Sequence, residues 1–169
     1  MQKKEYMNRI QRNFIGLALT LTVISLATWA QVPLLKAGDP SPKIAINDQH
    51  DKPWSIPADT KLVLFSGSRN ANTIVQSLLT QKGVDYLSSK KTVYFSDLSK
   101  MPGFITRTFA LPSMRDLPYS VGIVLNAEES QSWPREEDAV TAVFLNQGQI
   151  TKIEYIKNAE SLQQILDHQ

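Results

Sequence analysis

The stretch KLVLFSGSRNANTIVQSLL, residues 61–79, predicts a strand, a tight turn and a helix. Residues 62–65 form an unbroken apolar run, which is typical of a strand covered on both faces. The run stops at Ser66-Gly67-Ser68, and behind it apolar residues recur at the spacing of one helix face over residues 74–79. We expect Leu64 and Leu78 to be buried. In α/β domains such a strand-to-helix turn often forms a ligand site, because free backbone N–H groups converge there.

The composition is that of one domain with a substantial core, since 42% of the 169 residues are hydrophobic. The net charge of +2 originates in the first 30 residues; residues 31–169 carry 14 Lys and Arg against 15 Asp and Glu. No basic surface is concentrated in that part, so nucleic acid is not an expected partner. The chain has no cysteine, which excludes disulfides, a thiolate nucleophile and cysteine metal sites.

Residues 1–30 predict a signal peptide or an uncleaved membrane anchor. A basic region, residues 1–13, precedes the uncharged run FIGLALTLTVISLATWA, residues 14–30. Thr28 and Ala30 are small residues that favour cleavage before Gln31. If no cleavage occurs, residues 14–35 reach the roughly 20 residues that span a bilayer and attach the protein to the inner membrane. Either outcome predicts a periplasmic or otherwise extracytoplasmic location, with a linker over residues 31–42 and a domain over residues 43–169.

The remaining pattern predicts an α/β domain with one mixed sheet flanked by helices. Alternation over residues 43–47 indicates a half-buried strand, and Trp54 and Ile56 a returning one. Strands are expected at residues 92–95 and 121–125, with a helix from Gly103 to Leu111-Pro112 between them. Residues 140–145 and 149–156 predict a hairpin, and a last helix follows Asn158.

This order resembles the thioredoxin-like superfamily, in its exported peroxiredoxin-like branch. The sequence GDPSPKIAINDQHDKPWSI, residues 38–56, is similar to the opening of that family, and KLVLFSGSRN is similar to its central strand and active-site turn. AVTAVFLNQGQITKIEYIKNAESLQQIL, residues 139–166, resembles its closing hairpin and helix. The resemblance implies a thioredoxin-like fold over residues 38–169.

Two departures from the family bear on function. Where thioredoxins carry two cysteines, and peroxiredoxins a Thr and a Cys, the turn reads Ser-Gly-Ser-Arg-Asn-Ala over residues 66–71. The cis proline that the family places before the closing hairpin would align near Val140. The resemblance therefore implies a cysteine-less member, for which neither thiol–disulfide nor peroxidase activity is expected.

The turn itself supplies the first set of candidate binding residues: Ser66, Ser68, Arg69 and Asn70. A hydroxyl at such an elbow could act as a nucleophile with His50 as its base, which is the alternative of a serine-type, non-thiol enzyme. A capping or turn role for the serines is the preferred interpretation. Arg69 beside the helix start could bind a carboxylate or phosphate, although a solvated arginine is the simpler hypothesis.

The second set lies in MPGFITRTFALPSMRDLPY, residues 101–119. Core packing of the expected helix accounts for Phe104, Ile105 and Phe109. The apolar residues that follow are harder to bury, so part of this segment is expected to form an exposed partner surface. Its candidate binding residues are Met114, Arg115, Leu117 and Tyr119.

No metal or cofactor is expected. The acidic loop over residues 126–138, around Trp133-Pro134, lacks the ordered spacing of a calcium site and is interpreted as solvated and mobile. His50, His168, Met101 and Met114 are too scattered to indicate copper. The leading hypothesis is a non-catalytic, exported domain that binds a protein or peptide of the bacterial envelope.

Overall fold

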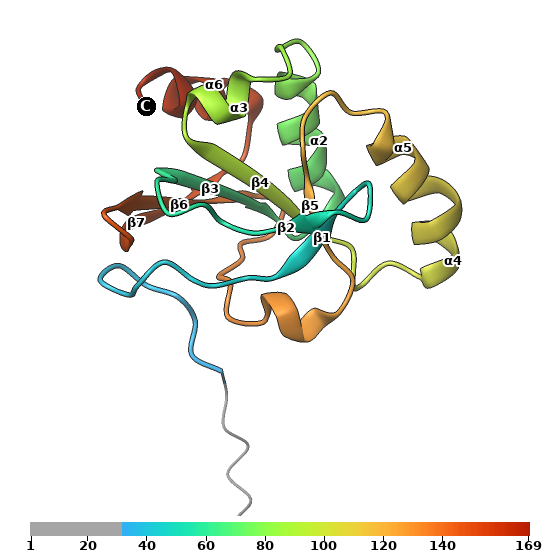
Figure 1. Cartoon of the computed structure of the whole chain (residues 1–169), viewed down its shortest axis with the longest axis horizontal. Helices are drawn as coiled ribbons and strands as arrows, with labels where there is room; N and C mark the ends of the chain where they lie inside the picture. The colour runs from blue at the N-terminus through green and yellow to red at the C-terminus, as the bar shows by residue number, and fades with distance from the viewer. Residues whose placement is uncertain (1–31) are drawn as a thin grey trace, which may run out of the picture. The chain divides into compact units, whose positions relative to one another are not determined.

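A seven-stranded mixed sheet runs through residues 32–169, the part of the chain that the computed structural model describes. Its strand order is β2-β1-β5-β4-β3-β6-β7 (Figure 1). The strands are β1 (Ile46–Asp48), β2 (Pro53–Trp54), β3 (Leu62–Ser66), β4 (Thr92–Asp97), β5 (Gly122–Val124), β6 (Val140–Asn146) and β7 (Gln149–Ile156). The helical segments are α2 (Arg69–Leu79), α3 (Tyr86–Ser89), α4 (Gly103–Ile105), the π-helical η1 (Thr106–Ala110), α5 (Leu111–Arg115), the 3-10 helix η2 (Ala127–Ser130) and α6 (Ala159–Asp167). The predicted fold class is confirmed; the predicted signal or anchor segment lies outside the described residues.

The strand directions define the edge of the sheet at which its parallel strands end. β3, β4 and β5 run parallel, so their carboxyl ends at Ser66, Asp97 and Val124 share one edge. β1 runs antiparallel to β5, with Asp48 opposite Gly122 at the start of β5. The β1–β2 turn that follows therefore lies beside the start of β5.

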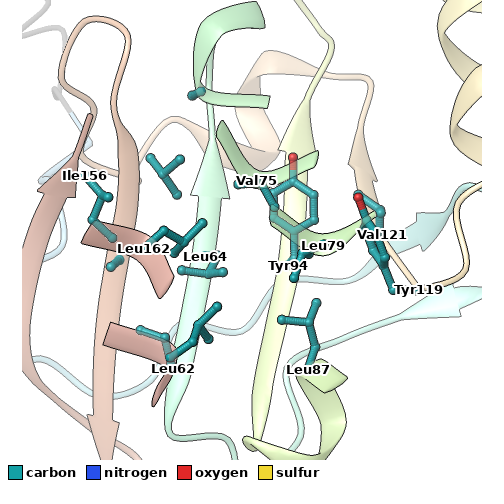
Figure 2. Packing of buried hydrophobic residues seen from close by; sticks show 14 of the residues in the cluster. Leu62, Leu64, Val75, Leu79, Leu87, Tyr94, Tyr119, Val121, Ile156 and Leu162 are labelled. Carbon is teal, nitrogen blue, oxygen red and sulfur yellow. The ribbon is translucent and has the colours of Figure 1, made fainter. Parts of the chain in front are cut away.

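The sheet buries a hydrophobic cluster on each face. Because successive side chains of a strand point to opposite faces, Leu62 and Leu64 join one cluster and Val63 and Phe65 the other. On the first face α2 and α6 cover the sheet, and Figure 2 shows Leu64, Val75, Leu79, Tyr94 and Leu162 packed together. Leu64 is fully buried as expected.

The helix α2 turns a slightly different face inward than the sequence predicts. Ala71, Val75 and Leu79, spaced by four residues, are its buried residues. Leu78 is only half-buried and packs at the margin of the cluster, so its predicted burial is wrong in degree. Residues four positions apart lie on nearly the same side of a helix, and the side that carries Ala71, Val75 and Leu79 faces the sheet.

The closing elements agree with their predictions. β6 and β7 pair antiparallel around a turn in which Gln147 and Gly148 both have positive φ. Asn158 caps α6 by accepting a hydrogen bond from the Ser161 N–H, and Leu162 and Leu166 are buried beneath that helix.

The β1–β2 hairpin closes over a glycine. Ile44 and Ile46 are both buried, but ladder pairing starts only at Ile46. Trp54 packs directly on Gly122, where an added Cβ would lie 2.6 Å from the indole ring. Only glycine permits this approach, so Gly122 couples the hairpin to β5.

Residues 101–119 differ from their prediction. The helix does not end at Leu111-Pro112: the Leu111 N–H donates to the Thr106 carbonyl five residues earlier, and the chain continues as α5. Pro112, which has no N–H to donate, directly follows this π-helical turn, where the regular hydrogen-bonding pattern of the α-helix is already interrupted. Phe104, Ile105 and Phe109, expected in the core, are exposed. The prediction that Met114 and Tyr119 contribute to an exposed partner surface is also wrong, because both residues are buried.

The acidic loop is only partly the solvated segment that the sequence predicts. Its carboxylates at residues 128, 129 and 136–138 are exposed. Trp133 is buried between Phe65 and Phe95, and Ser130 is fully buried. Asn126 and Glu129 form a reciprocal capping box that begins η2. The loop is therefore anchored in the second cluster by its apolar and small residues.

Residues 35–41, from the predicted linker, are hydrogen-bonded to the domain. The Leu35 N–H donates to the Ser132 carbonyl, and Pro40 forms a bridge with Gln149 beside β7. Among residues 32–169, no helix combines the length and apolar character needed to cross a bilayer.

Candidate functional site

The turn after β3 is organised by a buried network of three polar side chains. Asn72 Oδ1 accepts hydrogen bonds from the hydroxyls of Ser66, at 2.8 Å, and Tyr94. The Ser66 and Tyr94 oxygens also lie 2.8 Å apart. Burial raises the pKa of Tyr94 well above its ordinary value, so it remains a neutral donor. Ser66 is consequently a structural hydroxyl that fixes the start of α2 on β4.

Ser68 is the N-cap of α2. Its hydroxyl oxygen accepts from the Ala71 N–H at 3.2 Å, and its backbone is extended, as N-caps require. Arg69 and Asn70 follow on the first turn and are exposed. The preferred capping role therefore matches Ser68, whereas Ser66 lies at the end of β3 and bonds Asn72 and Tyr94 instead of capping the helix.

The proposed base of a serine-type enzyme is not at this turn. His50 lies in the β1–β2 turn, beside the start of β5. β5 and β4 also separate β1 from β3, which places the strands about 14 Å apart at the usual interstrand spacing. The suggestion that His50 lies near the turn is therefore wrong, because β1 pairs with β5 and not with β3.

An ion pair between Arg135, which is partly buried, and Asp97, which is buried, lies beside the turn and forms the floor of the cleft described below. The Arg135 guanidinium donates to Asp97 Oδ2 at 2.7 Å, and Ser130 Oγ donates to the same oxygen at 2.8 Å. The Ser99 N–H donates to Asp97 Oδ1. Burial alone would raise the pKa of Asp97, but the hydrogen bonds from Ser99, Ser130 and Arg135 outweigh it and hold the pKa below its usual range. Asp97 is thus a buried, ionised anchor for the acidic loop.

Gly67 lies close to the side chain of Arg135. The guanidinium lies over the Phe65 ring, 4.9 Å from its centroid, directly under the turn. A Cβ on residue 67 would come within 3.1 Å of Arg135 Nη1. The turn thus contacts the Arg135 guanidinium, which packs over the Phe65 ring and pairs with Asp97.

A polar cleft opens above this floor. It has a volume of about 310 Å³ and lies between the turn and the end of the acidic loop. Glu136 is paired with Lys157, while Glu137 and Asp138 are exposed on the rim. The cleft is lined by Gly67, Ser68, Lys100, Arg135, Glu136, Glu137, Asp138, Ala139 and Thr141. It combines cationic and anionic groups at the edge where three parallel strands end.

The second candidate set does not join the first. Arg115 donates to the Gln49 carbonyl at 2.9 Å and pairs with Asp51, at the β1–β2 turn. Gln49 in turn bonds the backbone of Tyr119 and Val121, at the start of β5. These backbones lead into β5, which β4 separates from β3 and the Ser66 turn.

Two of these four residues are core residues. Tyr119 is 5% exposed, its ring lies 6.5 Å from that of Tyr94, and burial raises its pKa to about 12 (Figure 2). Met114 is buried, and Leu117 packs half-buried on the same cluster. Only Arg115 of this set offers an exposed side chain.

The possible metal ligands are dispersed. His50 and His168 are exposed, whereas Met114 is buried and Met101 half-buried. Within residues 32–169, no three His, Asp or Glu side chains gather closely enough to hold a metal ion.

Sequence reasoning missed the residues that build the site: Asn72, Tyr94, Asp97, Ser130 and Arg135. Each lies at a helix start, a strand or a loop where its residue type is ordinary. One signal was available, since Asp97 directly follows the apolar run of β4 at the edge where Ser66 was placed. The sequence contains no signal for Arg135, because its partner Asp97 is 38 residues away and the two meet only in the folded domain.

The fold belongs to a known class. No family model matches the sequence, and no curated protein matches it. Solved structures do match: a protein assigned as the thiol:disulfide interchange protein DsbE from Chlorobium tepidum is 12% identical, covers 79% of this chain and 97% of its own, and has a TM-score of 0.54. A peroxiredoxin-like protein from Aquifex aeolicus is 8% identical, covers 80% of this chain and 88% of its own, and has a TM-score of 0.51.

A third match is a SCO1/SenC family lipoprotein from Bacillus anthracis str. Ames, 10% identical over 80% of this chain and 98% of its own, with a TM-score of 0.50. At these identities the likeness concerns the fold. The domain has a thioredoxin-like fold, and the chain contains no cysteine.

Proposed function

We propose that this protein is a non-catalytic thioredoxin-like domain of the bacterial envelope that binds an extended segment of a protein or peptide. One observation supports this most directly. At the carboxyl ends of the parallel strands, the hydroxyls of Ser66 and Ser68 are both used in structural hydrogen bonds, and a polar cleft lies beside them. In open α/β sheets, ligands bind at this edge.

The cleft indicates the chemistry of its partner. Glu137 and Asp138 place two exposed carboxylates along the cleft, and Lys100 also lines it; the exposed Arg69 directly follows the lining residue Ser68. A segment with a basic side chain toward the acidic rim and a carbonyl or carboxylate toward the helix start would satisfy both. The buried Asp97–Arg135 pair keeps the floor rigid, which lowers the ordering cost of binding.

Site-specific photocrosslinking tests the binding surface. A photoreactive residue replaces Asn70, two residues after the cleft residue Ser68, or Val84, an exposed position beyond the far end of α2. We expect a specific adduct in envelope extracts from position 70 and none from position 84. Glu137→Gln with Asp138→Asn should reduce the adduct, whereas Glu128→Gln with Glu160→Gln removes two charges elsewhere and should not. Equal adducts at both positions would reject the cleft.

A serine test separates binding from catalysis. Ser68→Ala removes a cap and should cost about 1 kcal/mol, without removing the cleft. A non-catalytic domain with this change should still rescue the phenotype of a deletion strain at permissive temperature. Loss of rescue with normal abundance of the protein would favour the serine-type enzyme instead.

Export is tested by a reporter. An alkaline-phosphatase fusion after Gln169 should be active, since residues 1–30 combine a basic region with an uncharged apolar run. A stable but inactive fusion would contradict the proposed location.

A further inference from the structure

An apolar helix face is exposed to solvent beside the cleft edge. Phe104 is 69% exposed, Phe109 59% and Ile105 38%. The two phenyl rings pack edge to face with centroids 6.1 Å apart, so they form one protruding unit. With Thr108 between them, these residues are called the Phe104–Phe109 patch. The opposite side of the same segment, at Thr106 and Met114, is buried.

The charge around the patch has one sign. From residue 98 to residue 115 the chain contains Lys100, Arg107 and Arg115 and no Asp or Glu. Arg115 is paired with Asp51, whereas Lys100 and Arg107 are exposed and form none of the salt bridges found among residues 32–169. The rest of the domain is near neutral, so this segment is locally cationic.

The patch projects from the segment that follows the carboxyl end of β4 and begins in α4 (Figure 1). The buried side of this segment, at Met101, Leu111 and Met114, packs on the first cluster. The phenyl rings therefore point away from the core.

We propose that the Phe104–Phe109 patch inserts into the headgroup region of an anionic lipid surface, with Arg107 contacting the phosphates. Aromatic side chains on one face of a helix, flanked by cations, are the pattern of an interfacial segment. Its small size also favours lipid over protein, since a stable protein interface involves about 20–30 residues a side. This inference rests on the proposed envelope location, but it uses a surface distinct from the peptide cleft.

Tethering would make a weak contact effective. A short linker gives the patch a high local concentration at the membrane, so three apolar side chains can suffice. The contact would hold the strand-end cleft close to the membrane surface.

The absence of cysteine permits a direct test. Thr108→Cys in the full chain is labelled with an environment-sensitive fluorophore, and Val84→Cys serves as the control position. The labelled protein is reconstituted in vesicles of phosphatidylglycerol and phosphatidylcholine, or of phosphatidylcholine alone, with a lipid-borne quencher. We expect quenching at position 108 in the anionic vesicles and none at position 84.

Two further variants assign the contact. Phe104→Ser with Phe109→Ser should abolish the quenching at position 108 while leaving the thermal midpoint unchanged. Arg107→Gln should weaken the contact about fivefold, the effect of one cation near an anionic surface. Equal quenching at positions 108 and 84 would overturn the proposal. So would a label that is shielded without lipid quenching and in proportion to protein concentration, because that result assigns the patch to a second copy of this chain.

Discussion

The β3–α2 unit and residues 101–119 carry the same kind of sequence pattern and adopt opposite orientations. Both place apolar residues at helical spacing. α2 directs its stripe, Ala71, Val75 and Leu79, onto the sheet. The second segment directs Phe104 and Phe109 into solvent. Periodicity therefore shows which residues share a helix face, but not whether that face meets the core.

The physical reason lies in how each helix is held. α2 follows β3 through a short turn, and the Ser68 cap and the Asn72 bonds fix its rotation on the sheet. In the second segment the π-helical turn at Thr106–Ala110 inserts a residue into the helical repeat. One added residue rotates all later side chains by about 100°, the angle per residue of a 3.6-residue turn. Met114 is thereby turned toward the core, where an apolar stripe from Phe104 would not predict it.

The largest expected effect belongs to the core of the first region. Leu64→Ala should lower the free energy of unfolding by about 2–5 kcal/mol, because it leaves a cavity among fully buried neighbours. Urea unfolding measures it, with Asn70→Ala as an exposed control in the same unit. Equal midpoints for the two variants would break the assignment of β3 as the central strand.

The ion pair under the turn should be the next most sensitive point. Asp97→Ala leaves the Arg135 guanidinium without its partner and should cost about 3 kcal/mol, at the lower end for buried pairs because Arg135 is partly exposed. The lowered pKa of Asp97 means that its contribution is present above about pH 4 and is lost as the pH falls below that value. Acid unfolding of the wild type should therefore be steeper than that of Asp97→Ala. Parallel pH profiles would contradict this role.

The two buried tyrosines should respond differently to the loss of their hydroxyls. Tyr94→Phe removes a donor to Asn72 and should cost about 1 kcal/mol. The buried Tyr119 hydroxyl has no hydrogen-bond partner within residues 32–169, so Tyr119→Phe should be neutral or slightly stabilising. Thermal unfolding of the two variants decides the point. A larger loss in Tyr119→Phe would show that this hydroxyl is bonded after all.

Stability at alkaline pH gives a second test of the burial of Tyr119. Burial raises its pKa to about 12, so the folded state retains the proton longer than the unfolded chain does. The resulting stabilisation is complete below about pH 10, the ordinary tyrosine value, and is lost as the pH rises to about 12. Wild-type stability should decline over this window more steeply than that of Tyr119→Phe. Identical slopes would indicate that Tyr119 is hydrated.

The smallest effect is expected on the exposed face of the second region. Phe109→Ala should change the free energy of unfolding by no more than about 0.5 kcal/mol, because the ring is more than half exposed. Urea unfolding beside Met114→Ala, a buried residue of the same segment, gives the comparison. A cost for Phe109 equal to that for Met114 would show that the face is covered.

The sequence by itself determined the fold class and most element positions. Apolar runs and alternation mark β3, β4 and the β6–β7 hairpin, and side-chain caps at Ser68 and Asn158 mark two helices. These signals are local, because burial on both faces, capping and turn formation depend on residues a few positions apart. The absence of cysteine likewise sets the chemistry of the whole chain.

Only the tertiary structure decided how the site is assembled. The Asp97–Arg135 pair, the Ser66–Asn72–Tyr94 network and the distance from His50 to Ser66 all depend on strand order. The sequence does not specify which strands become neighbours, since an apolar strand can pair with several others at similar cost. The burial of Met114 on the side away from Phe104 depends on a single inserted residue in a helix, which is settled by packing on the first cluster rather than by local preference.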